Sequence, residues 1–207
     1  MTQQKILFQG AEALILLDKK IINKKRIRKS YRLKKLDEKI RKLRTRSETK
    51  LLEKASKLIP VPKIVKVNKK SKEILMEFVE GKKLSDELEN FSETQQLKIF
   101  KKIGKNIVMI HNSNIIHGDL TTSNMIFNKK EKKVYFIDFG LGFFSSKIED
   151  KAVDLHLLKQ ALEAKHFKNW EKNFNEILKS YKTSKNSEKV FERLKKVESR
   201  GRYKEKY

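Results

Sequence analysis

The chain has 207 residues, of which 51 are Lys or Arg and 26 are Asp or Glu, so its formal net charge is +25. It contains no cysteine, which excludes disulfides, cysteine-based zinc sites, iron–sulfur ligation and a thiol nucleophile. No apolar run approaches the roughly 20 residues of a membrane span, and the N-terminus lacks the apolar core of a signal peptide. We therefore expect a soluble, cytoplasmic protein that does not associate with a membrane and that has an anionic binding partner.

The positive charge is concentrated in two segments. Residues 19–50 hold 16 basic and 3 acidic residues, and residues 179–207 hold 11 basic and 4 acidic residues. Arginine is frequent in the first segment, and its planar guanidinium binds phosphate in a bidentate way. Two interpretations stay open: a lysine-rich surface of biased composition, or two basic patches that meet in space and bind a polyanion.

The first 80 residues are predicted to be mainly strands. Short apolar runs between charged turns indicate these strands, and Gly10 marks a specific bend between the first two. The predicted strands span residues 5–8, 13–17, 20–27, 63–68 and 73–79.

One long helix interrupts these strands. Residues 31–58 contain neither glycine nor proline, and their apolar residues recur at spacings of three, four or eight before Pro60 ends the pattern. We therefore expect an amphipathic helix that buries one apolar stripe. The stripe consists of Leu36, Ile40, Leu43, Leu51, Ala55 and Leu58.

The rest of the chain is predicted to be mostly helical. Ser92 is the expected N-cap of a second long helix, and residues 111–118 are expected to form a loop. The apolar stripe of that helix is Leu97, Phe100, Gly104, Ile107, Val108 and Ile110. Short strands at 125–127 and 134–137 and helices at 149–164, 169–181 and 187–200 follow. This order predicts an α+β protein with a small antiparallel-sheet lobe, residues 1–80, and a reduced helical lobe, residues 81–207.

Two short motifs carry the candidate chemistry. Asp119 follows His-Gly and precedes Asn124 by five positions, and Asp138 stands in Ile-Asp-Phe-Gly. Phosphoryl transfer needs one carboxylate that orients or deprotonates the attacking group, and a carboxylate plus an amide oxygen that hold magnesium. Either motif alone is consistent with a capped turn, but both at this spacing indicate a catalytic site.

Together these motifs resemble the catalytic core of the protein-kinase-like superfamily. The resemblance implies a compact bilobal fold that binds ATP and Mg²⁺. It implies that Asp119 is the catalytic base or positions the nucleophile, and that Asn124 and Asp138 are metal ligands. It also implies a phosphate-binding lysine, for which we expect Lys24. The adjacent Lys25, on the opposite face of the strand, is its competitor.

The same resemblance implies further site residues. Glu48 in the long helix is expected to pair with Lys24 in the catalytic machinery. Residues 76–81 resemble the hinge, in which the Glu77 carbonyl and the Val79 amide contact adenine. The reduced phosphate loop would bind the nucleotide through Gly10, Glu12 and Ala13.

The chain also departs from ordinary protein kinases. Gly118 stands where an arginine that senses a phosphate is usual, and only 14 positions separate Gly140 from Asp154. A peptide-docking groove is therefore not expected. His117 is expected to brace the catalytic loop, and Asp154 either braces that loop too or is a solvated carboxylate at a helix start.

With these departures, the chain resembles the small atypical kinase subunits of the KEOPS (EKC) complex, the PRPK-like family. The resemblance covers residues 6–202. It is carried by Gly10-Ala11-Glu12-Ala13, by residues 24–32, by Arg44-Thr45-Arg46-Ser47-Glu48, by the two catalytic motifs, by residues 149–155 and by Arg200-Gly201-Arg202.

This resemblance implies a serine/threonine kinase-like ATPase that supports threonylcarbamoyl-adenosine modification of tRNA. It implies docking on the threonylcarbamoyl-transferase subunit and other KEOPS subunits. The basic helix and the C-terminal tail would bind tRNA through backbone phosphates, since aromatic residues are sparse in both segments. We expect that association to depend strongly on salt.

Three alternatives stay open. A small-molecule phosphotransferase of the aminoglycoside or choline type needs a larger helical pocket than the residues after Gly140 allow. A compact ribosome-biogenesis kinase usually lacks the pair found here as Phe139-Gly140. A non-catalytic tRNA-binding pseudokinase scaffold is disfavoured by the intact motif residues.

Overall fold

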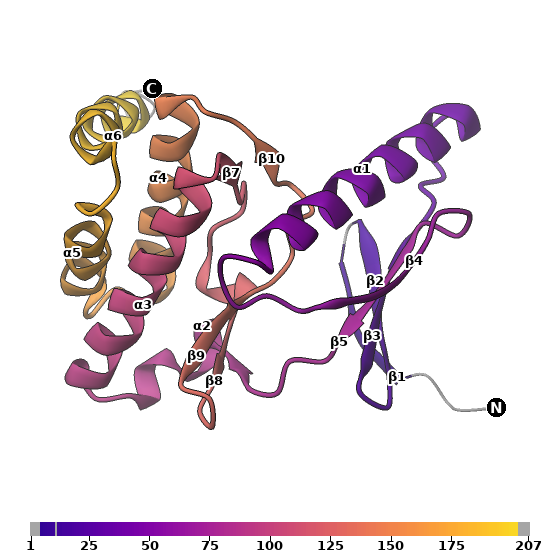
Figure 1. Ribbon diagram of the computed structural model, residues 1–207, viewed down its shortest axis with the longest axis horizontal. Helices are drawn as coiled ribbons and strands as arrows, with labels where there is room; N and C mark the ends of the chain where they lie inside the picture. Colours follow the sequence, from indigo (N-terminus) through magenta and orange to yellow (C-terminus); the bar gives the residue numbers. More distant parts are fainter. Residues whose placement is uncertain (1–4, 11, 203–207) are drawn as a thin grey trace.

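The computed structural model describes residues 5–10 and 12–202, which form a sheet-rich N-lobe and a helical C-lobe (Figure 1). The N-lobe is a five-stranded antiparallel sheet with the strand order β1-β2-β3-β5-β4. Its strands are β1 Lys5–Gln9, β2 Ala13–Asp18, β3 Ile21–Arg26, β4 Ile64–Asn68 and β5 Glu73–Glu77. The five predicted strands and the α+β class are confirmed, while the boundary at residue 80 stays a prediction.

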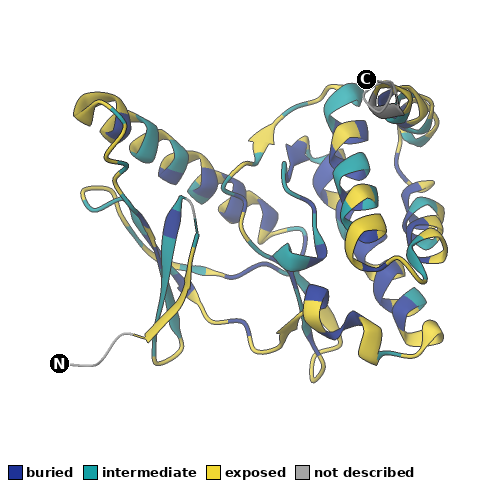
Figure 2. Ribbon diagram, turned by 180° about the vertical axis from the view of Figure 1, so that it is seen from behind, coloured by how far each residue is buried: buried dark blue, intermediate teal, exposed yellow. Residues whose placement is uncertain are grey.

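The long basic helix is α1, Lys34–Ala55, three residues shorter at each end than predicted. Its C-terminal half lies against the sheet and the C-lobe and buries Leu51, Leu52 and Ala55. The prediction of one continuous buried stripe was wrong, because Leu36 is 49% exposed and Leu43 is 55% exposed. Figure 2 shows the reason: the N-terminal end of α1 extends past the elements that could cover it.

Four helices form most of the C-lobe. Helix α3, Glu93–Asn112, packs against α5, Trp170–Tyr181, and α4, Ile148–Lys165, packs against α6, Ser187–Arg202. Gly104 allows α3 to approach α5 closely, since a Cβ there would lie 2.6 Å from the Ser180 Cβ.

The predicted N-cap of α3 is confirmed. The Ser92 hydroxyl accepts from the Gln95 backbone N–H at 3.3 Å, and the Ser92 N–H donates to the Gln95 side chain at 3.0 Å, which completes a capping box. The predicted stripe omitted Ile99 and Ile103, which are buried, whereas Leu97 is partly exposed.

The loop predicted at residues 111–118 is wrong in two respects. Helix α3 continues through Asn112, because the His111 side chain has polar partners inside the C-lobe. A short strand, β7 Ile115–Ile116, then pairs with β10, Phe143–Phe144.

A small three-stranded sheet with the order β6-β8-β9 follows the predicted hinge, residues 76–81. Its strands are β6 Lys82–Lys83, β8 Met125–Asn128 and β9 Lys133–Phe136. Three short helical elements flank it: α2 Leu84–Glu87, η1 Leu88–Asn90 and η2 Thr122–Asn124. One hydrophobic core runs from Leu51 and Met76 in the N-lobe to Phe100 and Tyr181 in the C-lobe, so both lobes share a packed interface.

Within the described residues, no helix has both the length and the apolar character needed to cross a membrane.

The two basic segments do not meet in the described structure. The N-terminal end of α1 and helix α6 lie at opposite ends of the molecule (Figures 1 and 2). The last part of the basic tail, residues 203–207 with Tyr203 and Tyr207, lies outside the described residues. The interpretation of two patches that form one surface is therefore wrong for the described parts.

Candidate functional site

A cleft between the lobes contains the motif residues. It consists of two adjoining hollows of about 300 and 380 Å³. Apolar side chains such as Met76 and Ile126 dominate the first hollow, which the predicted hinge residues Glu77 and Val79 also line. Charged and polar side chains dominate the second hollow. The residues shared by both hollows are Phe8, Ile15, Lys24, Lys83, Asn124 and Asp138. The cleft thus suits a ligand with an apolar end and a charged end.

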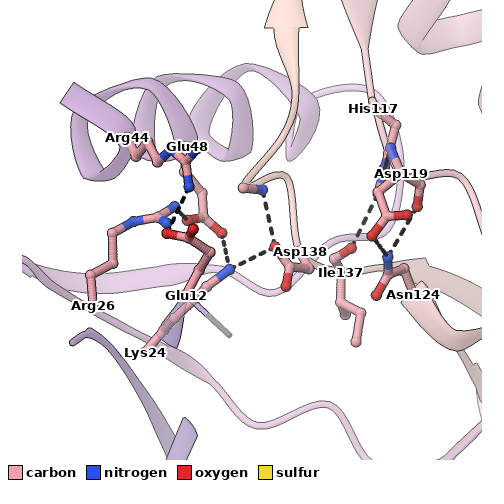
Figure 3. A network of polar contacts seen from close by, with 11 residues as sticks. Glu12, Lys24, Arg26, Arg44, Glu48, His117, Asp119, Asn124, Ile137 and Asp138 are labelled. Carbon is pink, nitrogen blue, oxygen red and sulfur yellow. Dashed lines mark hydrogen bonds and ion pairs between the residues drawn. The ribbon is translucent and has the colours of Figure 1, made fainter. Parts of the chain in front are cut away.

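The side chain of Lys24 links the two lobes across this cleft. Its Nζ lies 2.6 Å from Glu48 Oε1 and 2.6 Å from Asp138 Oδ1 (Figure 3). Because side chains alternate along β3, Lys25 points to the other face, where it pairs with Glu73 at 3.3 Å. The structure therefore places Lys24, and not its competitor Lys25, in the cleft.

Charge pairing keeps Lys24 and Asp138 ionised. Burial is the largest influence on the pKa of Lys24 and lowers it, but Glu48 and Asp138 outweigh burial, so the net pKa is raised. Burial likewise raises the pKa of Asp138, and the neighbouring Lys24 ammonium reverses this to a net lowering. The lysine and the aspartate are therefore both charged at neutral pH.

Arg26 is a member of the network that the sequence analysis missed. Its guanidinium lies 2.5 Å from Glu48 Oε2, and the residue is only 4% exposed. Glu48 is thus held by two cations, Lys24 and Arg26. Strand alternation could have predicted this position, because Arg26 is two residues after Lys24 on β3 and therefore faces the same side of the sheet.

The predicted phosphate-loop residues Gly10, Glu12 and Ala13 all line the second hollow. The Glu12 carboxylate is bound by Arg44 at 2.7 Å and by Arg32 at 3.3 Å. Burial raises the pKa of Glu12, but the two arginines overcome this and lower it. Glu12 therefore ties the β1–β2 connection to the region around α1, and its contact with a ligand stays a prediction.

The Asn124 amide holds together the two motif residues of the predicted catalytic loop, Asp119 and Asn124. Asn124 Nδ2 donates to the Asp119 carbonyl oxygen at 3.0 Å and to its carboxylate at 2.8 Å (Figure 3). The Asn124 amide oxygen accepts no hydrogen bond from any described residue. The Asp138 side chain is 49% exposed. Asp119, Asn124 and Asp138 all line the second hollow, so the structure brings the three motif residues together.

Asp154 is a buried brace of the catalytic loop. Its carboxylate accepts the backbone N–H groups of His117 and Gly118, each at 2.9 Å. The same carboxylate contacts His111 Nε2 at 3.1 Å, and His111 Nδ1 lies 2.9 Å from the Tyr181 hydroxyl. Of the two interpretations of Asp154, the solvated carboxylate is therefore wrong. His111 and Tyr181 are further members of this network that the motifs alone do not reveal.

Gly118 is required by the backbone geometry at its position. Its φ is +77°, and a Cβ there would lie 2.4 Å from the Leu141 carbonyl oxygen. A larger residue would force apart the catalytic loop and the segment after Asp138. This contact explains locally why no arginine stands at this position.

His117 braces the same loop as a neutral imidazole. Its Nδ1 accepts the Asp119 backbone N–H at 3.3 Å, and its Nε2 lies 3.1 Å from the Ile137 carbonyl oxygen. A proton on Nε2 alone satisfies both contacts. Burial is the main cause of a lowered pKa for this histidine, which favours the same neutral form.

This lowered pKa predicts an acid-sensitive contribution to stability. The pKa of His117 in the folded protein lies below its value in the unfolded chain, about 6.5, so the unfolded chain binds more protons between the two values. The free energy of unfolding should therefore fall as the pH drops below about 6.5. We expect His117→Gln to show a flatter dependence between about pH 7 and 5, measured by urea unfolding at several pH values. Equal slopes in the two proteins would contradict this role.

Comparisons with known proteins show which families resemble this chain. A family model described as the RIO domain matches residues 4–142. The KEOPS complex subunit Bud32 of Pyrococcus abyssi is 42% identical over 97% of this chain and 97% of that protein. A probable bifunctional tRNA threonylcarbamoyladenosine biosynthesis protein of Methanobrevibacter smithii is 42% identical over 96% of this chain, which spans 36% of that longer protein.

A solved structure supports the fold alone. The bifunctional kinase-methyltransferase WbdD superimposes with a TM-score of 0.58 at 16% identity, over 83% of this chain and 42% of that one. Together with the antiparallel sheet, the helical C-lobe and the cleft, this likeness confirms a kinase-like fold. The chain belongs to the kinase-like RIO-domain family and, at 42% identity over nearly the full length of both chains, to the family of the Bud32 proteins.

Proposed function

We propose that this chain is an ATP- and Mg²⁺-dependent serine/threonine kinase-like ATPase that works in a KEOPS complex and supports threonylcarbamoyladenosine modification of tRNA. The observation that carries the proposal is the network of Lys24, Glu48 and Asp138, which shares one cleft with Asp119 and Asn124. The complex and the tRNA reaction are taken from the names of the Bud32 and bifunctional relatives.

The two hollows match the two ends of ATP. The apolar hollow suits adenine, and the backbones of Glu77 and Val79 on its border offer a carbonyl and an amide for the base edge. The polar hollow suits the phosphates, because Lys24 stands where the two hollows join and Arg26 lines the second. An ammonium and a guanidinium there favour an anionic ligand.

The available oxygen atoms fit Mg²⁺. This ion is usually held by one or two carboxylates together with substrate phosphates and water. Asp138 offers a half-exposed carboxylate, and Asn124 offers an amide oxygen that no described residue occupies. Bound there with ATP, the ion neutralises charge on the phosphates.

The contacts of the chain itself support the remaining roles that we propose. Lys24 holds the phosphates and is oriented by Glu48 and Arg26. Asp119 orients the attacking hydroxyl or water and accepts its proton, with its carboxylate held in place by Asn124. Asp154 fixes the backbone that carries Asp119, so its role is one of positioning.

A basic hollow beside α1 supports the tRNA part of the proposal. It has a volume of about 550 Å³ and lies between α1 and β4. Its basic lining residues are Lys42, Arg46, Lys50 and Lys69, and none of them forms an ion pair within the described chain. We propose that this hollow and the basic tail contact separate parts of a tRNA bound to the complex, because α1 and α6 lie far apart.

The deciding experiment measures ATP turnover by the chain alone, then with the threonylcarbamoyl-transferase subunit, and then with tRNA added. Stimulation that requires the assembly is expected. Robust phosphorylation of unrelated peptides by the isolated chain would contradict the ATPase assignment. Absence of turnover in every mixture would favour the pseudokinase scaffold.

A further inference from the structure

A third basic surface lies on the C-lobe, outside the cleft and on elements other than α1 and α6. It is a hollow of about 620 Å³ between α3 and the β8–β9 hairpin, which we call the α3 hollow. No carboxylate lines it in the described part of the chain. Its lining lysines are Lys98, Lys101, Lys102, Lys105, Lys129 and Lys132.

Four of these lysines form a row on one face of α3. Residues 98, 101, 102 and 105 form pairs three or four positions apart (98/101, 98/102, 101/105 and 102/105), and such pairs stand about 5–6 Å apart at Cβ. Lys98, Lys101 and Lys105 form no ion pair with any described residue. Like charges at these spacings destabilise a helix, and a bound anion would relieve the repulsion.

Two aromatic rings also line the α3 hollow: Phe127 of the β8–β9 hairpin and Phe91, which immediately precedes the N-cap of α3. Phe91 and Phe127 are both partly exposed and pack edge to face, with ring centroids 5.5 Å apart. The Lys129 ammonium lies 5.2 Å from the centre of the Phe91 ring. A smaller hollow of about 220 Å³ also has Phe127 and Lys129 in its lining, so the surface continues along the hairpin.

We propose that the α3 hollow binds a single-stranded segment of RNA. Lys98, Lys101 and Lys105, which form no ion pair with a described residue, stand beside aromatic rings. This is the combination that single-strand binding surfaces use: the cations follow the phosphates, and the rings stack on bases. An acidic polypeptide would satisfy the lysines but would offer no base to stack on the partly exposed rings of Phe91 and Phe127. The choice of RNA as occupant also rests on the proposed tRNA function.

The test uses the whole chain and a fluorescein-labelled oligouridylate of about ten nucleotides, a length within the usual site sizes, with binding followed by anisotropy. We expect the triple variant Lys98→Gln, Lys101→Gln and Lys105→Gln to bind at least about 10-fold more weakly. The slope of log affinity against log salt should become shallower by about 2, since each lost phosphate contact accounts for about 0.7.

The matched control removes the same charge elsewhere. Lys57, Lys63 and Lys168 are exposed, lie outside both basic segments and the α3 hollow, and form no ion pair with a described residue. Their replacement by glutamine should change the affinity less than about 2-fold. A second variant, Phe91→Leu, keeps an apolar side chain but removes the ring, and we expect at least about a 5-fold loss from lost stacking.

Three results would overturn the proposal: equal losses in the two triple variants, no binding of oligouridylate by the unaltered chain, or tighter binding of a glutamate-rich peptide than of the RNA. ATP turnover is measured on the same proteins and should be unchanged in the α3 variant. A chain that binds the RNA but turns over no ATP would sink the proposed ATPase while leaving the α3 hollow intact.

Discussion

Replacement of Asp138 by asparagine is expected to lower ATP turnover by about 100- to 1000-fold, because metal-assisted charge stabilisation contributes several kcal/mol. The substitution removes a charge that faces both Lys24 and the proposed Mg²⁺ position. The side chain is 49% exposed, so the fold should survive the change. Phosphate release from ATP, in the assembly that shows turnover, is the measurement.

Asp86→Asn is the matched control for this experiment. Its carboxylate is 63% exposed and lies outside the cleft, where it contacts Lys165 at 3.4 Å. Turnover should stay within about 2-fold of the unaltered chain, since exposed ion pairs contribute little. If Asp138→Asn retained full turnover while the chain stayed folded, the metal role of Asp138 and the proposed ATPase mechanism would both be wrong.

Asp154→Asn should lower the free energy of unfolding by about 2–4 kcal/mol, although the two side chains have nearly the same shape. The aspartate accepts two backbone N–H groups, those of His117 and Gly118, and also faces His111. Asparagine has only one accepting oxygen. Its amide N–H₂ group would therefore face one of the backbone N–H donors that the Asp154 carboxylate accepts, and that donor would lose its hydrogen bond. Urea unfolding measures the loss, and ATP turnover should fall with it because these N–H groups position the catalytic loop.

Asp150 on the same helix provides the control for that substitution. Its partly buried carboxylate accepts one hydrogen bond, from the Ser145 hydroxyl at 2.5 Å. We expect Asp150→Asn to cost about 1 kcal/mol or less, the value of one ordinary hydrogen bond. Equal losses of unfolding free energy in the two variants would show that the hydrogen bonds of Asp154 to the loop backbone stabilise the fold no more than one ordinary hydrogen bond does.

The local patterns of the chain predicted most of its elements. Alternating and helical periodicities located the five strands of the N-lobe and all the long helices, because they depend on neighbours a few residues apart. The catalytic motif residues were also found from local spacing, and strand alternation is enough to separate Lys24 from Lys25. Periodicity did not show which part of a helix would be covered, as exposed Leu36 and Leu43 demonstrate.

Partnerships between distant side chains were decided by the tertiary structure. Lys24 and Asp138 are 114 positions apart and meet because the lobes close on each other. Arg26 joins Glu48, and Tyr181 joins His111, only when helices and strands from different parts of the chain pack together. The roles assigned to these groups stay predictions, but their proximity does not depend on those roles.

The net charge of +25 follows from the sequence by itself, and so does its concentration in two segments. Only the folded chain separates these segments to opposite ends and creates a third basic surface at the α3 hollow. Segment-by-segment counting missed that surface, because its lysines come from two places that lie apart in the sequence, α3 and the β8–β9 turn. Electrostatic potential depends on distance in space, so packing determines where an anion can bind.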